Sequence, residues 1–443
     1  MNGANTAFVL ISAALVMLMT PGLAFFYGGM VRVKSTLNML MMSFISLGVV
    51  SLLWVLFGYS LAFGDDLGGG LLGNLDHVGF KGIDPTSLWG EKPDAVPVLA
   101  FALFQLMFAV ITPALISGAV ADRVKFGAWT LFITLWVTVV YFPVAHWVWQ
   151  ADGWLFKQEV IDFAGGTAVH INAGAAGLAL ALVLGKRIGF KRDPMRPHSL
   201  PLVMLGSGLL WFGWFGFNAG SALAANGTAA NMAFNTQIAT GVAMLGWLAY
   251  ERVRHGAFTT LGAASGAVAG LVAITPSGAA VDPWGAIVIG LVAGVVCSWA
   301  VSLKYKLGFD DSLDVVGVHL VGGIVGTLLV GVLATDGVGG MTQLGKQALG
   351  AFTVLGYSFV VSYVLAKLIH ATMGFRADED DEVSGIDQAF HAETAYDFSG
   401  VGSSPRSTVP AVSHAMTGGA ASQDKKSQAK QDTKAEQDKK VDA

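Results

Sequence analysis

Apolar stretches of about 20 residues recur along this chain, and they constrain its fold more than any other feature. That length is what an α-helix needs to cross the hydrocarbon core of a bilayer. Of the 443 residues, 54% are hydrophobic and 13% are charged, whereas charged residues make up about 25% of an average soluble domain. The sequence therefore excludes an ordinary soluble protein and predicts an all-α polytopic membrane protein.

We expect eleven transmembrane helices. The apolar stretches are about twice as long as a transmembrane β-strand, and they lack the alternation of such strands. Small residues recur in them at helical spacing, which lets membrane helices approach closely. The expected helices span residues 7–29, 38–63, 97–120, 127–149, 163–185, 200–222, 232–250, 258–275, 284–303, 315–334 and 348–371.

The first stretch has no Lys or Arg before it. A secretory signal peptide needs a positive leading region and a shorter apolar core, so we interpret residues 7–29 as a retained membrane helix. The loops then predict the orientation, because Lys and Arg concentrate on the cytoplasmic side. With the N-terminus outside, the inner loops hold thirteen Lys and Arg and the outer loops hold four, which places the C-terminus in the cytoplasm.

The overall charge and the cysteine content limit which partners and ligands we expect the chain to bind. The formal net charge is −4, and no basic cluster is interleaved with aromatic residues, so nucleic acid is not an expected partner. Cys297 is the single cysteine, which excludes a disulfide within the chain and a Cys/His zinc site. We expect no cofactor and no metal.

The composition changes abruptly after Thr372. Residues 1–373 form the expected transmembrane domain. Residues 374–399 mix acidic with apolar side chains and are expected to form a cytoplasmic C-terminal regulatory region. Residues 400–443 are rich in Ser, Gln, Lys and Asp, a composition typical of a disordered polar tail.

Two of the expected helices begin alike, which indicates an internal repeat. In each, an acid is followed by a Val-His pair whose His lies eight residues on: Asp162 precedes His170, and Asp311 precedes His319. The second segment begins the tenth expected helix and the first begins the fifth, so the predicted orientation makes them enter from opposite faces, as in the inverted repeats of transporters. Eight helical residues rise about 12 Å, which places both histidines near the middle of the membrane.

Paired histidines inside the membrane indicate function, because ionisable groups are rare there. A lone His would more simply satisfy a packing hydrogen bond. Haem ligands usually come with further paired histidines, and a metal site would need carboxylate or Cys neighbours at the same depth; neither accompanies this pair. The remaining interpretation is a pore lined by neutral imidazoles, which hydrogen-bond a small polar molecule or relay a proton.

Aromatic residues lie along or at the outer ends of three expected helices. Phe108 follows Phe104 by one turn, and Trp149 closes the fourth helix. Phe217 and Ser221 close the sixth. Aromatic faces attract cations, although aromatic belts mark membrane interfaces in general, so spacing alone leaves both interpretations open.

Three long motifs make the chain resemble the ammonium transporter family, which comprises ammonium transporters, methylammonium permeases and Rhesus proteins. They are DFAGGTAVHINAG at 162–174, GWFGFNAGS at 213–221 and DDSLDVVGVHLVGG at 310–323. The match is to the bacterial ammonium transporter branch and extends over residues 7–397.

The resemblance implies a fold and an outer site. The fold has eleven transmembrane helices, an inverted five-plus-five repeat plus an eleventh helix, assembled as a homotrimer with one pore per subunit. The outer recruitment site for ammonium would consist of Phe108, Trp149, Phe217 and Ser221.

The resemblance also implies roles along the pore. Phe108 and Phe217 would form a stacked gate below the recruitment site. His170 and His319 would be the twin histidines of the narrow pore. Asp162 would order the recruitment site by capping its helix, without touching the substrate.

A C-terminal stretch is similar to the family's conserved cytoplasmic region. That region contacts neighbouring subunits and a PII-type nitrogen signalling protein that plugs the pores. The resemblance implies that the contact residues are Gly385, Asp387, His391, Glu393 and Tyr396. Ala392 stands where the family usually has Gly.

The resemblance implies a transporter, not an enzyme, in the bacterial plasma (inner) membrane. Ammonium and potassium carry the same charge, and a dry apolar pore rejects both ions, but only ammonium can lose a proton and continue as ammonia. We therefore expect ammonium to be recruited and deprotonated, and ammonia to be conducted with net proton transfer. A passive ammonia channel and an ammonium sensor with the same fold remain alternatives. A water or glycerol channel would carry paired Asn-Pro-Ala motifs, and none occurs here.

Overall fold

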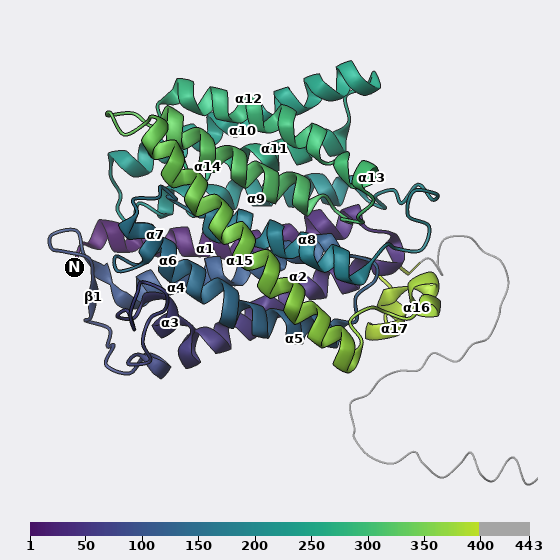
Figure 1. Ribbon diagram of the computed structural model, residues 1–443, viewed down its shortest axis with the longest axis horizontal. Coiled ribbons are helices and arrows are strands. Elements are labelled where there is room, and N and C mark those ends of the chain that lie inside the picture. Colours follow the sequence, from purple (N-terminus) through teal and green to yellow (C-terminus); the bar gives the residue numbers. More distant parts are fainter. Residues whose placement is uncertain (398–443) are drawn as a thin grey trace, which may run out of the picture. The chain divides into compact units, whose positions relative to one another are not determined.

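The computed structural model describes residues 1–397, and Met1–Ala395 forms one compact unit of packed helices (Figure 1). The predicted tail, 400–443, lies outside the described residues. The longer helices are α1 (Gly3–Met30), α2 (Thr36–Leu53), α4 (Val98–Ile116), α5 (Phe126–Trp136), α8 (Asn172–Leu184), α9 (Leu200–Gly220), α10 (Gly227–His255), α11 (Thr260–Ile274), α12 (Pro283–Ala300), α14 (Val321–Leu333) and α15 (Met341–Met373).

Shorter elements connect or extend these helices. The short α-helices are α3 (Tyr59–Phe63), α6 (Phe142–Trp149), α7 (Trp154–Lys157), α13 (Leu303–Leu307), α16 (Glu379–Ser384) and α17 (Ile386–His391). The 3₁₀ turns are η1 (Val33–Ser35), η3 (Val78–Phe80) and η4 (Ser117–Val120), and the π-helical segments are η2 (Trp54–Gly58), η5 (Val137–Tyr141), η6 (Gly166–Ile171) and η7 (Val316–Leu320). Strands β1 (Leu88–Trp89) and β2 (Val96–Pro97) pair antiparallel, with Trp89 opposite Val96.

Within residues 1–397, nine helical stretches are long and apolar enough to cross a membrane. Each of the eleven expected helices coincides with a helix, but two of them do not meet that criterion. α11 has only 15 residues. α10 has 29 residues but carries buried polar side chains, among them Asn235, Thr236 and Thr240. Each of these three side chains donates a hydrogen bond to a backbone carbonyl oxygen, so the donor groups of α10 are paired inside the bundle despite its polarity.

Polar side chains in the loops start several helices. Each accepts a hydrogen bond from the backbone N–H three residues later, which satisfies a group that the helix leaves unpaired. These caps are Ser199 for α9, Asn226 for α10, Thr259 for α11 and Asp282 for α12.

Glycines let α1 and α9 pack backbone against backbone. A Cβ atom at Gly206 would lie 2.2 Å from the backbone nitrogen of Phe26, and one at Gly213 would lie 2.7 Å from the carbonyl oxygen of Leu15. Close approach of this kind is typical of membrane helices that carry small residues. It brings side chains of α1 and α9 together around the cavity described below.

The longest helix, α15, crosses the bundle and links its parts (Figure 1). It packs against α8 and α14, which continue the segments carrying His170 and His319. Ser358 donates a hydrogen bond to the carbonyl oxygen of Asn172, and the indole of Trp136 donates one to Ser362. α15 is therefore fixed against both halves of the chain along much of its length.

The chain after α15 folds back onto the loops at one end of the unit. Phe375 and Ile386 are buried. The carboxylate of Glu382 is also buried and accepts hydrogen bonds from Arg376 and from the N–H of Ile188. Charged as well as apolar contacts thus hold this segment in place.

Candidate functional site

The two histidines singled out by the repeat lie in direct contact. The Nδ1 atoms of His170 and His319 are 3.3 Å apart, and their ring centroids are 5.4 Å apart. Both side chains are buried, with 1% and 2% of their surface exposed. Because the rings touch each other, a haem cannot lie between them as an axial pair.

Both histidines belong to π-helical segments, η6 and η7. A π-helical turn inserts an extra residue into an α-helix and often marks a functional site, because it redirects the side chains that follow. In η6, the N–H groups of Val169 and His170 both donate to the carbonyl oxygen of Gly165 at 3.0 Å. The same irregularity therefore directs one imidazole from each half toward the other.

An aspartate holds the start of each π-helical segment. The carboxylate of Asp162 accepts hydrogen bonds from four backbone N–H groups, those of residues 165–168, and from the hydroxyl of Thr167. The carboxylate of Asp311 accepts from the N–H groups of Val315 and Val316 at 3.1 and 2.8 Å. Asp162 has the geometry of a helix cap, and its side-chain oxygens accept hydrogen bonds from the backbone.

The contact between the two Nδ1 atoms assigns complementary roles to the outer ring nitrogens. One Nδ1 must donate its proton and the other must accept it. The ring that donates then has a bare Nε2, while the other ring carries its proton on Nε2. The Nε2 atom of His170 is buried and has no hydrogen-bond partner among the described residues, so it is free to bind a small polar molecule.

The three aromatic residues predicted for the outer site lie together, and Ser221 follows Phe217 by one helical turn. The rings of Phe108 and Phe217 are 4.2 Å apart with an interplanar angle of 31°, and Trp149 meets Phe108 edge-on at 5.8 Å. The indole N–H of Trp149 donates to the carbonyl oxygen of Asp162 at 3.0 Å. The hydroxyl of Ser221 donates to the carbonyl oxygen of Phe217, which leaves its oxygen able to accept a hydrogen bond from a cation.

The aromatic group continues into the histidine pair without a break. Phe217 stacks on His170 at 6.1 Å. Trp214 also stacks on His170, at 5.4 Å and 21°, although sequence reasoning did not single it out as a site residue. The signal was present, because Trp214 precedes Phe217 by three residues and therefore shares its helix face.

A hydrogen-bonded group holds Trp214 in place. Its indole N–H donates to the hydroxyl of Thr275, which is within hydrogen-bond distance of the side-chain oxygen of Asn218 at 3.1 Å. The amide of Asn218 in turn donates to Thr236. These residues come from α9, α10 and the end of α11, so tertiary packing fixes the ring that covers His170.

The space beside the histidines is narrow and apolar. Its volume of about 10 Å³ is close to the minimum that holds one water molecule. The lining residues besides the two histidines are Met19, Leu23, Phe26, Ile111, Leu115, Val169, Leu210, Trp214, Phe217 and Val268. An ion that entered this space would lose nearly all of its hydration, at a cost of many kcal/mol.

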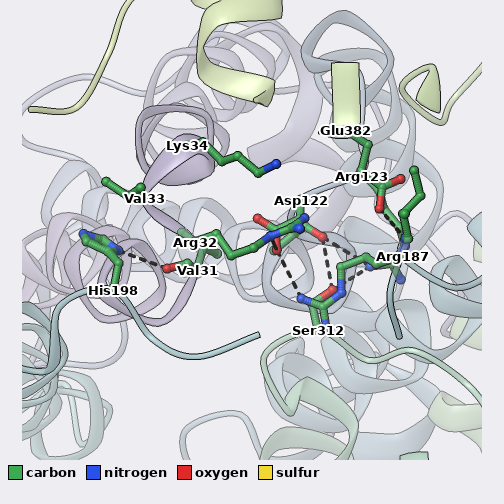
Figure 2. Close-up of polar contacts among 12 residues, drawn as sticks. Val31, Arg32, Val33, Lys34, Asp122, Arg123, Arg187, His198, Ser312 and Glu382 are labelled. Carbon is green, nitrogen blue, oxygen red and sulfur yellow. Dashed lines mark hydrogen bonds and ion pairs between the residues drawn. The ribbon is translucent and has the colours of Figure 1, made fainter. Parts of the chain in front are cut away.

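A wider cavity of about 530 Å³ lies near the Asp311 end of η7 and contrasts with this narrow space. Charged side chains line much of it, namely Arg32, Arg187, Lys191, Arg192, Arg196, Lys304, Asp122, Asp193 and Asp314. Figure 2 shows Arg32 and Arg187 converging on Asp122. A guanidinium nitrogen of each arginine lies 3.2 Å from the Oδ2 atom of Asp122.

Arg187 also binds Asp310, with a guanidinium nitrogen 2.9 Å from the carboxylate. Burial acts to raise the pKa of Asp310, but the hydrogen bonds and charge of Arg187 and the charge of Arg123 hold that pKa below its usual value.

The predicted partner-binding residues lie in and around α17. The carboxylate of Asp387 is buried and accepts the N–H groups of Leu37 and Asn38, at the start of α2. His391 lies 3.0 Å from the side-chain oxygen of Asn38. Burial raises the pKa of Asp387 and lowers that of His391, although their mutual attraction opposes both shifts.

The other predicted partner-binding residues flank α17. Gly385 has a φ of 137° and lies before the helix, against Lys34. Ala392 ends the helix with a φ of 54°, so the left-handed turn forms although the residue is not glycine. Glu393 is exposed, and so is Tyr396, which lies in a separate unit.

Comparison with known proteins agrees with the motifs. Residues 7–396 match the model of the Ammonium Transporter Family. An ammonium transporter from Mycobacterium tuberculosis is 57% identical, over 92% of this chain and 94% of its own length. The crystal structure of Saccharomyces cerevisiae Mep2 is 36% identical and covers 85% of this chain and 88% of its own, with a TM-score of 0.78. A structure described as a sensor Amt protein is 29% identical, with a TM-score of 0.81 over 87% of this chain and 98% of its own.

Proposed function

The chain belongs to the ammonium transporter family, and from this premise we propose that it recruits ammonium, deprotonates it and conducts ammonia past the paired histidines. The observation that carries this proposal is the unbroken series of rings from Trp149 through Phe108 and Phe217 to the two imidazoles. A cation-binding surface thus leads directly into a space too narrow and apolar for a hydrated ion.

Recruitment depends on the aromatic surface and one hydroxyl. The faces of Phe108 and Trp149 attract a cation through their quadrupoles, which contributes about 0.5–2 kcal/mol per contact. The hydroxyl oxygen of Ser221 accepts an N–H of the ammonium ion. Because Asp162 is occupied by the backbone, it orders this site and does not bind the substrate.

Selectivity follows from the step after recruitment. The rings of Phe108 and Phe217 lie 4.2 Å apart and close the path, so a substrate passes only when they move. Potassium cannot shed its charge, whereas ammonium can transfer a proton to the bare Nε2 of the histidine pair and continue as neutral ammonia. The unpartnered Nε2 of His170 then hydrogen-bonds the ammonia.

The histidine pair also provides a route for the proton. Transfer across the contact between the two Nδ1 atoms exchanges the donor and acceptor roles of the rings. A proton taken up on one Nε2 is thereby released from the other. Net charge transfer is the form of transport that we favour: the proton is relayed through the two imidazole rings, and ammonia passes beside them.

We further propose the assembly that the family resemblance implies. The chain would form a homotrimer in the bacterial inner membrane, with eleven membrane helices, an inverted repeat and its N-terminus outside. Residues 1–373 would form the transport domain, 374–399 a regulatory region and 400–443 a polar tail. A PII-type signalling protein would bind at the cytoplasmic face, at the region containing Gly385, Asp387, His391, Glu393 and Tyr396. Reduced ammonium uptake after a PII-type protein is added to the inner face would support the proposed PII binding.

The decisive experiment measures current from the purified protein in liposomes. We expect an inward current when ammonium is added and no current with potassium. Rapid methylammonium uptake without current would instead establish the passive ammonia channel.

The resemblance to a sensor Amt structure keeps sensing as a second candidate. Saturable ammonium binding without uptake or current would favour the sensor. Uptake by the reconstituted protein would exclude a sensor that does not transport.

A further inference from the structure

A buried amide on α15 uses its entire hydrogen-bonding capacity next to the proposed recruitment site. Gln347 is fully buried, and a glutamine side chain has two donor hydrogens and two acceptor lone pairs. Its Oε1 accepts the N–H of Ile161 at 2.7 Å and the amide of Gln343 at 3.2 Å. Its Nε2 donates to the carbonyl oxygens of Ile161 at 2.7 Å and Thr327 at 3.2 Å. A glutamine side chain that makes all four of these hydrogen bonds is held in one orientation, so it also restrains the backbone groups to which it is bonded.

The residue that Gln347 fixes lies directly before Asp162. Both backbone groups of Ile161 are bonded to the one amide. The next residue, Asp162, caps η6 through its carboxylate and accepts the indole of Trp149 through its carbonyl oxygen. A shift of Ile161 would therefore move the helix start and the Trp149 ring together.

The same amide reaches the other half of the chain. Thr327 belongs to α14, eight residues after His319. Gln347 thus joins the loop that leads to His170 with the helix that follows His319, at the end where Trp149 lies. A second amide, Gln343, extends the contact by donating to the carbonyl oxygen of Glu159.

We call Gln347 and Gln343, with their hydrogen bonds to the backbone of Ile161, Thr327 and Glu159, the amide clamp. The side chains that form the clamp carry no charge, so they do not repel a cation bound nearby. A fixed positive charge about 10 Å from an ammonium ion would raise its energy by about 1.7 kcal/mol at an effective dielectric constant of about 20. Lys or Arg at position 347 could also bind carbonyl oxygens but would oppose recruitment. An amide holds both the donor and the acceptor of Ile161 without this penalty.

Building on the proposed function, we propose that Gln347 is a positioning residue for ammonium recruitment. It holds Ile161 so that Asp162 and Trp149 keep the aromatic surface in register with Phe108. Gln347 does not contact the substrate. Its loss affects how well the outer site binds ammonium more than how fast the pore conducts at saturation.

The test compares Gln347→Met, which nearly preserves volume and removes the hydrogen bonds, with the wild type in liposomes. We expect the half-saturating ammonium concentration to rise about ten-fold, since the lost bonds together are worth about 1.4 kcal/mol at the site. The maximal rate per folded protein should change less than two-fold. The ratio of methylammonium to ammonium uptake should also shift, because the aromatic surface loses its fixed geometry.

Two further variants keep the result interpretable. Ser362→Ala removes a buried hydrogen bond from the same helix, on Trp136, away from the proposed recruitment site, and should leave half-saturation and the substrate ratio unchanged. Gln343→Met removes only the outer part of the clamp and should raise half-saturation by a smaller factor in the same direction. Gln343→Met also tests the inference if Gln347→Met does not fold.

A lower maximal rate with unchanged half-saturation and substrate ratio in both glutamine variants would overturn the inference, because it would indicate a merely structural role. Equal shifts in Ser362→Ala would overturn it as well. The wild-type protein distinguishes the two proposals: absence of wild-type uptake refutes the proposed transport and this inference with it. Wild-type uptake with unaltered variants refutes only the role of Gln347.

Discussion

The two histidine-bearing segments begin in the same way but are held by opposite chemistry. We call 162–170 the outer segment and 311–319 the inner segment, after the predicted orientation. At the outer segment, an indole and an amide bind the backbone of Ile161 and Asp162. At the inner segment, Arg123 binds the carbonyl oxygen of Asp310 at 2.6 Å, and Lys304 binds that of Asp311 at 2.8 Å.

The difference teaches where fixed positive charge is compatible with the proposed transport. Carbonyl oxygens accept hydrogen bonds from neutral and charged donors alike, and charged donors form the stronger bonds. The outer segment nevertheless uses neutral donors, where a cation would have to be attracted. The inner segment uses cations, where neutral ammonia would leave and where cytoplasmic loops carry Lys and Arg in any case.

We expect the largest effect from a variant that removes the buried ion pair next to the inner segment. Asp310→Asn removes the ionic partner of Arg187, whose side chain is 7% exposed. Leaving a buried charge uncompensated typically costs about 3–5 kcal/mol. We expect a marked fall in the thermal unfolding temperature in detergent. An unfolding temperature equal to that of the wild type would mean that Asp122 alone is sufficient for Arg187.

The pH dependence of stability provides a matching control for Asp310→Asn. The pKa of Asp310 is lowered in the folded protein, so its contribution to stability is complete above the ordinary aspartate pKa of about 3.9. That contribution is lost as the pH falls through the lower folded pKa. The wild type should therefore lose more stability below about pH 4 than Asp310→Asn does.

The second prediction asks whether the two imidazoles act as one unit. We expect His170→Ala and His319→Ala each to reduce ammonium-evoked current roughly 100-fold, the scale typical of lost proton transfer, or to admit potassium. The folded protein should persist, as judged by gel filtration in detergent. Wild-type methylammonium uptake with intact exclusion of potassium in either variant would contradict the proposed role.

The third prediction compares the two aspartates directly. Asp162 accepts five hydrogen bonds and Asp311 accepts two through its carboxylate. Asp162→Asn should therefore destabilise the protein by about 2 kcal/mol and Asp311→Asn by about 1 kcal/mol. Only the first should also raise half-saturation for ammonium, because only Asp162 supports Trp149. The reverse order of stabilities in chemical denaturation would refute this comparison.

The smallest effect concerns the segment that packs beside the inner loops. Ala392 adopts a φ of 54°, a conformation that costs a non-glycine residue about 1 kcal/mol. Ala392→Gly should relieve most of this strain, although glycine also gains freedom in the unfolded chain. Hydrogen exchange should then show slightly greater protection of α17. Faster exchange in the variant would mean that the turn is not strained.

Much of the architecture was predictable because it depends on local properties of the chain. The lengths of the apolar stretches predicted the helices, and the matched Asp–His spacing identified the two segments that meet. The aromatic residues that the family resemblance grouped also lie together, whereas their spacing alone left a membrane-interface belt equally open. The two expected helices that fall short of the spanning criterion, α10 and α11, show the limit of this reasoning. In α10, buried polar side chains donate hydrogen bonds to carbonyl oxygens, which hydropathy alone does not predict.

Other features could not be read from the sequence. The spacing of Trp214 and Phe217 puts them on one helix face, but nothing in the motif shows that this face meets His170. The π-helical turns change the register of side chains, and apolar periodicity does not reveal them. Gln347 precedes an expected helix by one residue and gains its importance only because α15 crosses the loop at Ile161.

By itself, the sequence determined that this is a membrane-spanning helical protein with two similar histidine segments, because hydropathy and residue spacing act along the chain. Only the tertiary structure decided that those imidazoles touch, which rings cover them and which amide fixes the outer loop. The physical reason is that His170 and His319 are 149 residues apart. Their contact depends on helix packing and on two π-helical turns, and both are properties of the assembled bundle.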